Sequence, residues 1–210
     1  MNWPGGGGSS GGFDSAGASV SDKSSGYETI AEVFARTRSA SIGSGVVRNW
    51  AKRLRPGATI LDLGCGNGVP ITETLIQDGF EVYGVDASAT LVAQFRGRFP
   101  DVAVECNPVE ESVFFDRTFD AAVAWGLVFL LPAGTQRALV GKVARVLNAG
   151  GHFLFTAPRQ VCTWKDGLTG LLSISLGQTE YEGALAAHGL ALVGNDEDEG
   201  GNYYYLATKL

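Results

Sequence analysis

The sequence has little of what metal centres and disulfide frameworks require. Its three cysteines, Cys65, Cys106 and Cys162, are odd in number and far apart, and only two histidines accompany them. Without a Cys-x-x-Cys pair or a cluster of histidines, the chain offers no complete ligand set for structural zinc. We therefore expect free thiols, no metal and a reducing, cytoplasmic location.

Basic charge and long apolar runs are also scarce. Sixteen basic residues against 22 acidic ones give a net charge of −6, without the lysine and arginine excess that binds a phosphate backbone. No apolar run approaches the roughly 20 residues that cross a bilayer, and the start lacks a basic and apolar leader. We expect a small molecule as the partner, rather than nucleic acid or a membrane.

Large apolar side chains are nearly missing from residues 1–26, which contain eight glycines and seven serines. Such a segment cannot bury enough surface to offset its chain entropy. The composition predicts a disordered tail over residues 1–26. Residues 27–210 have a length typical of one domain with one core.

Apolar periodicity in residues 27–210 predicts alternating helices and strands. Two helices come first, the second of which Ser44 can cap, and Ser88 can cap a later one. Strands are predicted at residues 59–63, 81–86, 102–106, 119–125, 152–156, 190–193 and 203–208, with a long connection at residues 157–177. This alternation predicts an α/β fold with a doubly wound, mostly parallel sheet.

A glycine-rich turn lies between the first strand and the next helix. Gly64, Gly66 and Gly68 allow the backbone to turn sharply and to approach a ligand closely. Asp86 follows Gly64 by 22 residues, near the roughly 20-residue separation at which an acidic side chain meets a ribose. Val69 stands where the pyrophosphate fingerprint has its third glycine, which favours an adenosine-type ligand without phosphates over NAD.

Together these motifs resemble those of the class I S-adenosylmethionine-dependent methyltransferases that act on small molecules. The motifs are Ile60–Gly68, Val82–Ser88, Phe119–Gly126 and Leu147–Gly151, and they follow one another in the order and spacing of that family. The resemblance covers residues 27–210. It implies a Rossmann-like sheet of seven strands whose last strand is antiparallel, two N-terminal helices before the sheet, and S-adenosyl-L-methionine as the cofactor.

The resemblance also implies which residues contact the cofactor. Asp86 would bind the ribose hydroxyls, Arg38 the carboxylate, and the backbone carbonyl of Trp125 the ammonium group. Cys65 would pack in the loop rather than react, because nothing beside it in the sequence lowers its pKa. The complete expected set is Tyr27, Arg38, Asp62, Gly64, Cys65, Gly66, Asp86, Ala87, Ser88, Glu110 and Trp125.

The acceptor is expected at the same edge of the sheet. Ligands of open α/β sheets bind outside the carboxyl ends of the parallel strands, so the connections leaving those ends form the walls. These connections predict Phe129, Arg159, Trp164 and Asn202 as acceptor contacts, with Glu199 as a base or cation partner.

The predicted reaction is methyl transfer from S-adenosylmethionine to a small molecule by in-line displacement, in which positioning supplies much of the rate. Two alternatives remain open: a cofactor-binding regulator without transfer activity, and an NAD-dependent oxidoreductase. Cofactor binding without turnover would mark the first, and tight NAD binding the second. The sequence does not specify the acceptor, because variable loops build its pocket.

Overall fold

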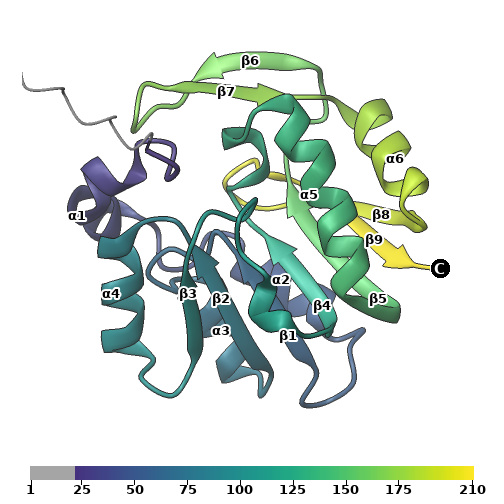
Figure 1. Ribbon diagram of the computed structural model, residues 1–210, viewed down its shortest axis with the longest axis horizontal. Coiled ribbons are helices and arrows are strands. Elements are labelled where there is room, and N and C mark those ends of the chain that lie inside the picture. The colour runs from purple at the N-terminus through teal and green to yellow at the C-terminus, as the bar shows by residue number, and fades with distance from the viewer. Residues whose placement is uncertain (1–21) are drawn as a thin grey trace, which may run out of the picture.

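A seven-stranded sheet lies at the centre of residues 22–210, the part of the chain that the computed structural model describes (Figure 1). Its strands are β1 (Thr59–Leu63), β2 (Glu81–Asp86), β3 (Ala103–Cys106), β4 (Phe119–Ala124), β5 (Leu147–Thr156), β8 (Leu190–Glu197) and β9 (Tyr203–Lys209). Their order is β3-β2-β1-β4-β5-β9-β8, and every pairing is parallel except the two that β9 makes. The predicted doubly wound sheet with its last strand antiparallel is confirmed.

Helices cover both faces of this sheet. They are α1 (Tyr27–Thr37), α2 (Ser44–Ala51), α3 (Ile71–Gln77), α4 (Ala89–Arg98), α5 (Ala133–Val146) and α6 (Gln178–Ala187), with short 3-10 helices η1 (Phe114–Asp116) and η2 (Val128–Leu130). The two predicted N-terminal helices are present, but Ser44 does not cap the second. Gly43 holds the cap position of α2 with a φ of 86°, a left-handed conformation that favours glycine.

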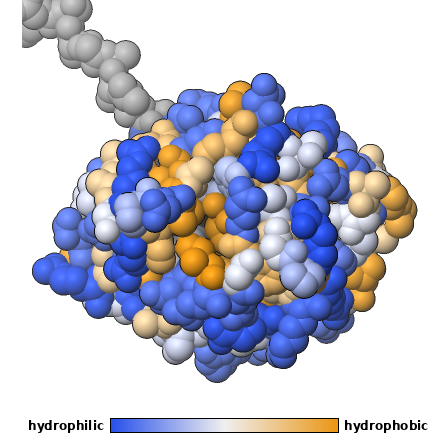
Figure 2. Space-filling view, turned by 90° about the horizontal axis from the view of Figure 1, so that it is seen from below, coloured by the Kyte–Doolittle hydropathy of each residue, from blue (hydrophilic) through white to orange (hydrophobic). Residues whose placement is uncertain are grey.

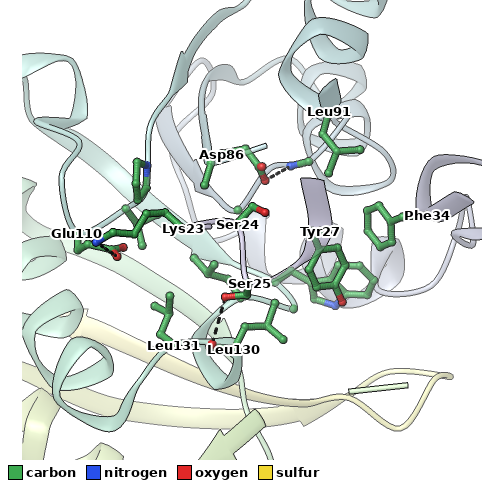
Figure 3. A pocket seen from close by; sticks show the side chains of 18 of the residues that line it. Lys23, Ser24, Ser25, Tyr27, Phe34, Asp86, Leu91, Glu110, Leu130 and Leu131 are labelled. Atoms are coloured by element: carbon green, nitrogen blue, oxygen red, sulfur yellow. Dashed lines mark hydrogen bonds and ion pairs between the residues drawn. The ribbon is translucent and has the colours of Figure 1, made fainter. Parts of the chain in front are cut away.

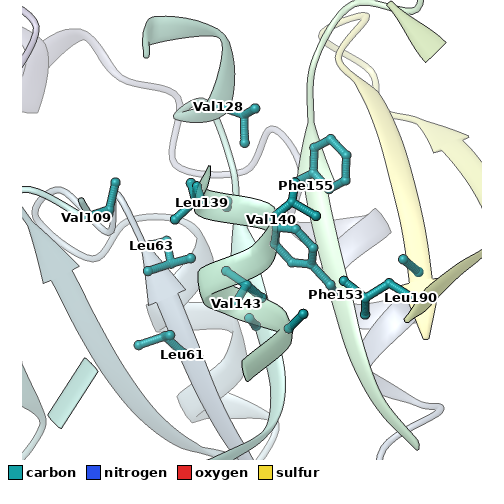
Figure 4. Packing of buried hydrophobic residues seen from close by; sticks show 14 of the residues in the cluster. Leu61, Leu63, Val109, Val128, Leu139, Val140, Val143, Phe153, Phe155 and Leu190 are labelled. Atoms are coloured by element: carbon teal, nitrogen blue, oxygen red, sulfur yellow. The ribbon is translucent and has the colours of Figure 1, made fainter. Parts of the chain in front are cut away.

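Alternate side chains of the strands enter two hydrophobic cores. On β1, Ile60 packs with α2 and α3, whereas Leu61 and Leu63 pack with α5 and α6. On the α5 side, Val143 packs against Phe153 of β5 (Figure 4). Because the central strands are buried on both faces, the carboxyl edge of the sheet is a firm base for ligand contacts.

The connection between β5 and α6 differs from the long loop that the sequence predicts. It contains β6 (Cys162–Lys165) and β7 (Leu172–Ser175), which pair antiparallel as a separate two-stranded sheet. Gln136 of α5 anchors this hairpin, since its side-chain amide donates to the carbonyl of Ile174 at 2.9 Å. Tyr181 of α6 donates to the Oε1 of Gln136 at 2.7 Å. Because buried polar contacts hold the hairpin, its sequence has no apolar periodicity that would predict it.

The described chain includes residues 22–26, which the sequence analysis assigned to the tail. The carboxylate of Asp22 accepts the backbone N–H groups of Ser24 at 2.8 Å and Gly26 at 2.9 Å. A Cβ on Gly26 would come within 3.2 Å of Thr169 in the β6–β7 turn, so this segment contacts the hairpin. The rest of the predicted tail, residues 1–21, lies outside the described residues.

Hydrophilic residues cover most of the face that Figure 2 shows, with apolar side chains gathered near its middle. Within residues 22–210, no helix is long and apolar enough to cross a membrane. A few large apolar side chains are well exposed, among them Val113 at 68%. Val113 can therefore serve as an exposed control for the buried core residues.

Replacing Phe153 by alanine should lower the free energy of unfolding by about 3–5 kcal/mol, because the ring is 1% exposed and leaves a cavity. Val113→Ala, an exposed control, should change it by no more than about 0.5 kcal/mol. Urea unfolding followed by circular dichroism measures both. Equal effects of the two substitutions would contradict the assignment of Phe153 to the core.

Candidate functional site

The glycine-rich turn joins β1 to α3 at the carboxyl edge of the sheet. Gly64, Gly66 and Gly68 have φ values of 70°, 56° and 86°, in the left-handed region that strains other residues. A Cβ on Gly68 would also collide with the ring of Phe99. The backbone N–H of Gly64 donates to the carbonyl of Val85 at 2.8 Å, so the turn is bonded to the end of β2.

Asp86, the last residue of β2, is built into the same turn. Its Oδ2 accepts the N–H of Gly66 at 2.8 Å and its Oδ1 accepts the N–H of Ser88 at 2.8 Å. Burial raises the pKa of Asp86 above its ordinary value, although both backbone hydrogen bonds favour the charged form. Each carboxylate oxygen keeps a second lone pair, so Asp86 can also accept hydrogen bonds from ligand hydroxyl groups.

A first cavity opens between the glycine turn, α1 and the segment after β4, and Asp86 lies beside it (Figure 3). Eight of the eleven expected cofactor contacts border it: Tyr27, Arg38, Gly64, Gly66, Asp86, Ala87, Glu110 and Trp125. Glu110 lines the cavity, whereas its neighbour Glu111 does not.

Two parts of this wall were not predicted from the sequence. One is Lys23, Ser24 and Ser25, which lie just before α1 and border the cavity. The Nζ of Lys23 lies 3.6 Å from the Oε1 of Glu110, across the cavity wall. The other part is apolar and includes Leu130, whose carbonyl accepts the hydroxyl of Ser25 at 3.3 Å. Neither part carries a motif, because small polar and apolar residues are common in such segments.

Asp62 and Cys65, two of the other expected contacts, lie outside the wall of the cavity. Asp62 is buried, where its Oδ2 accepts the hydroxyl of Thr72 at 2.6 Å, and burial raises its pKa to about 6. Burial also raises the pKa of the Cys65 thiol, and a Cβ on Gly84 would come within 2.8 Å of its Sγ. Cys65 is thus a packing residue, as the sequence predicted.

Ser88, the remaining expected contact, also lies outside the wall. It caps α4 as predicted, because its Oγ accepts the N–H of Leu91 at 3.2 Å. Its hydroxyl donates to the carboxylate of Glu28, which ties α1 to α4. The side chain is committed to these two bonds, so Ser88 supports the wall without forming it.

Arg38 places a fixed cation at the cavity. Its Nε donates to the carbonyl of Val69 at 2.7 Å, and its guanidinium carbon lies 4.3 Å from the ring centroid of Trp125 and 4.8 Å from that of Phe34. Burial lowers the pKa of Arg38 to about 10, so the group stays charged at neutral pH. The remaining N–H groups of the fork suit a carboxylate.

A second cavity of about 540 Å³ lies on the far side of the segment after β4. All four predicted acceptor contacts, Phe129, Arg159, Trp164 and Asn202, border it. The rings of Phe129 and Trp164 pack with centroids 5.3 Å apart and form an aromatic wall. The hairpin β6–β7 thus supplies the side chain that the sequence analysis placed in a loop.

Glu199, the predicted base, borders neither cavity. Strand β8 ends at Glu197, and the turn that follows carries Glu199 outwards to an exposed position. Glu197 is the acidic residue of this turn that borders the second cavity. Asp198, between them, is buried and accepts the side-chain amide of Asn202 at 2.9 Å. Which of the three carboxylates borders the cavity depends on the position at which β8 ends. The sequence of the acidic run does not show that position.

Two contacts connect the cavities. The hydroxyl of Tyr27, which borders the first, lies 3.5 Å from the Oδ2 of Asp166, which borders the second. The backbone N–H of Gly126, in the wall of the first, donates to the hydroxyl of Thr156, in the wall of the second, at 2.8 Å. The two cavities therefore share a thin wall, and ligands bound in them would be neighbours.

Comparison with known proteins gives a family match over the glycine turn and the strands around it. Residues 60–151 match the family model described as a methyltransferase domain. The demethylmenaquinone methyltransferase of Beutenbergia cavernae is 34% identical over 101 residues, 48% of this chain and 40% of that protein. The cypemycin N-terminal methyltransferase of a Streptomyces species is 35% identical over 138 residues, 63% of this chain and 56% of that protein. The chain thus spans about half the length of these relatives.

Solved structures share the fold at low identity. The CcbJ methyltransferase from Streptomyces caelestis superposes with a TM-score of 0.72 at 15% identity, covering 90% of this chain and 98% of that one. An amino pentose methyltransferase from Micromonospora echinaspora, solved with S-adenosylmethionine bound, gives a TM-score of 0.68 at 20% identity, covering 87% and 96%. Residues 60–151 therefore match a methyltransferase domain, in agreement with the resemblance that the motifs carry, and the sheet around them has the fold of these solved methyltransferases.

Proposed function

We propose that this chain is an enzyme that binds S-adenosylmethionine in the first cavity and transfers its methyl group to a small molecule in the second. The observation that supports this most directly is the pair of fixed charges at the first cavity. Asp86 offers a carboxylate to a ribose, and Arg38 offers a guanidinium to a carboxylate. A nucleoside joined to an amino acid needs both.

The glycine turn fits the same ligand. Gly66 borders the cavity, and because it has no Cβ a ligand can lie directly against its backbone. Glu110, which lines the cavity, would accept a hydrogen bond from the exocyclic amine of an adenine, and Ala87 would give the adenine a small apolar contact. These residues suit an uncharged base and sugar and offer no nest for a pyrophosphate.

When bound, S-adenosylmethionine supplies a methyl group on a positively charged sulfur. The residues of this chain would hold that group in line with the acceptor and keep water away, which is the main source of rate in such displacements. The shared wall between the cavities, formed by Gly126 and Thr156, is where the two ligands would meet. The names of the two relatives also describe methyl transfer, one to demethylmenaquinone and one to the N-terminus of cypemycin.

Asp86→Asn should weaken the binding of both S-adenosylhomocysteine and 5′-methylthioadenosine by about tenfold or more, because both carry the ribose whose hydroxyls the carboxylate accepts. Titration calorimetry measures both affinities. Asp101→Asn, on the exposed surface before β3, is the charge-matched control. Unchanged affinities in a folded Asp86→Asn protein would contradict the ribose assignment.

Arg38→Lys should separate the two ligands. It removes the planar fork while keeping a cation, so the affinity for S-adenosylhomocysteine should fall about tenfold. The affinity for 5′-methylthioadenosine, which has no carboxylate, should change by less than about twofold. A matched loss for both ligands would show that Arg38 supports the cavity wall and does not bind the carboxylate.

A further inference from the structure

We propose that the acceptor in the second cavity carries an amino group, which the aromatic wall and the carboxylates of Asp166 and Glu197 hold as a cation. The inference rests on the proposed methyl transfer and names the substrate class of that reaction. It follows from the charges that border the cavity, the direction of one side-chain amide and the aromatic wall.

The charged groups at the cavity are mainly acidic. Asp166 and Glu197 border it with two carboxylates, against the single guanidinium of Arg159. The Nε of Arg159 is already bonded to the Oε1 of Gln178 at 2.8 Å, which fixes the direction of the fork. A cationic group on the acceptor would therefore meet an excess of negative charge.

Asp166 is held firmly in place. Its Oδ1 accepts the backbone N–H groups of Leu168 at 3.1 Å and Thr169 at 2.8 Å, and the hydroxyl of Thr169 at 3.0 Å. Its Oδ2 has a single long contact, with the hydroxyl of Tyr27 at 3.5 Å. The carboxylate thus has one oxygen fixed by the turn and one with spare capacity beside the first cavity.

Asn202 borders the same cavity, and its amide has a fixed direction. Its Nδ2 donates to both carboxylate oxygens of the buried Asp198, each at 2.9 Å. Hydrogen bonds from Asn202, Tyr204 and Gly200 hold the pKa of Asp198 below its ordinary value, although burial acts to raise it. Asp198 stays charged at neutral pH and can only accept, so the amide cannot turn over. The carbonyl oxygen of Asn202 is left to meet a donor such as an N–H group.

The aromatic wall favours the same kind of group. Phe129 and Trp164 are in contact, and Tyr203 borders the cavity beside them. The faces of such rings attract an ammonium group within about 6 Å of the ring centroid. The rings also give an apolar surface to the carbon skeleton of the acceptor.

Methylation of an amine also requires a weaker base than methylation of an alcohol. Alkyl hydroxyls are far weaker acids than ammonium groups, so their methylation depends more on a strong general base. Both histidines of the chain lie outside the wall of the second cavity. His152 of β5 lies 3.2 Å from the hydroxyl of Thr208 on β9, and His188 packs against Gly141 of α5. An ammonium group can lose its proton to water before the transfer, while Glu197, which borders the cavity, accepts a hydrogen bond from an N–H that remains.

The atoms and charges of the step balance with these groups. The ammonium first gives a proton to water. The nitrogen lone pair then forms the bond to the methyl carbon, and the electron pair of the broken carbon–sulfur bond stays on sulfur. The products are a methylated ammonium and a neutral thioether, so no oxidant or reductant is needed.

The test uses phenethylamine and 2-phenylethanol, two probes of nearly the same shape that differ in the amino group. The protein is first saturated with S-adenosylhomocysteine, whose binding is measured separately. Phenethylamine should bind at least about tenfold more tightly than the alcohol, and Glu197→Gln should remove about tenfold of that affinity. Glu199→Gln, a matched change in the same turn but outside the cavity, should alter it by less than about twofold.

Three results would overturn the amine assignment while leaving the cofactor site intact. They are equal binding of the two probes, equal weakening by the two substitutions, and no binding of phenethylamine to protein that binds S-adenosylhomocysteine normally. Failure of S-adenosylhomocysteine to bind the unaltered protein is a different outcome, because it rejects the proposed function and the amine assignment together.

Discussion

The parallel pairing of β1 with β2 sets the position of the candidate cofactor contacts. In this register Leu63 lies beside Val85, so the glycine turn leaves β1 at the level where Asp86 ends β2. The turn is then bonded to β2 twice, through Gly64 to Val85 and through Gly66 to Asp86. A shift of one residue in this pairing would turn the carboxylate to the other face of the sheet. The two hydrophobic cores, which pack against both faces of β1 and β2, prevent such a shift.

The second cavity depends on a different kind of support. Part of its wall comes from the β6–β7 hairpin and the β8–β9 turn, which add few side chains to the hydrophobic cores. Buried polar groups hold these segments instead: Gln136 binds the hairpin, and Asp198 binds the turn through Asn202 and Tyr204. Polar contacts of this kind are directional, so they fix the angle of a loop where apolar packing would leave it free.

The sequence predicted the seven strands of the main sheet, its antiparallel last strand and most of the residues that border the first cavity, because these features rest on local patterns and motifs. Strand periodicity placed Asp86 at a strand end, and the glycines marked the turn beside it. The patterns could not show that Asp62 and Ser88 have their side chains committed to Thr72 and Glu28. Which side chain of a motif reaches the ligand depends on partners distant in the chain, and a motif does not encode them.

The acceptor side was harder to predict for a related reason. Topology alone placed Phe129, Arg159, Trp164 and Asn202 near the carboxyl edge, and all four border the second cavity. The choice between Glu197 and Glu199 needed the end of β8, which is set by pairing with β9 and not by any property of the acidic run. Likewise, Lys23 to Ser25 border the first cavity although their composition resembles the tail before them.

The separate hydrogen bonding of β6 and β7 has a consequence for how this chain can change over evolutionary time. Because β6 and β7 pair with each other and with no other strand of residues 22–210, the length and the side chains of the hairpin can vary without shifting the register of the seven-stranded sheet. Substitutions at positions such as Trp164 can therefore alter the shape of the second cavity while Asp86 and Arg38 keep their places. Descendants of one ancestral protein could in this way diverge in the molecules they recognise and still share an unchanged first cavity.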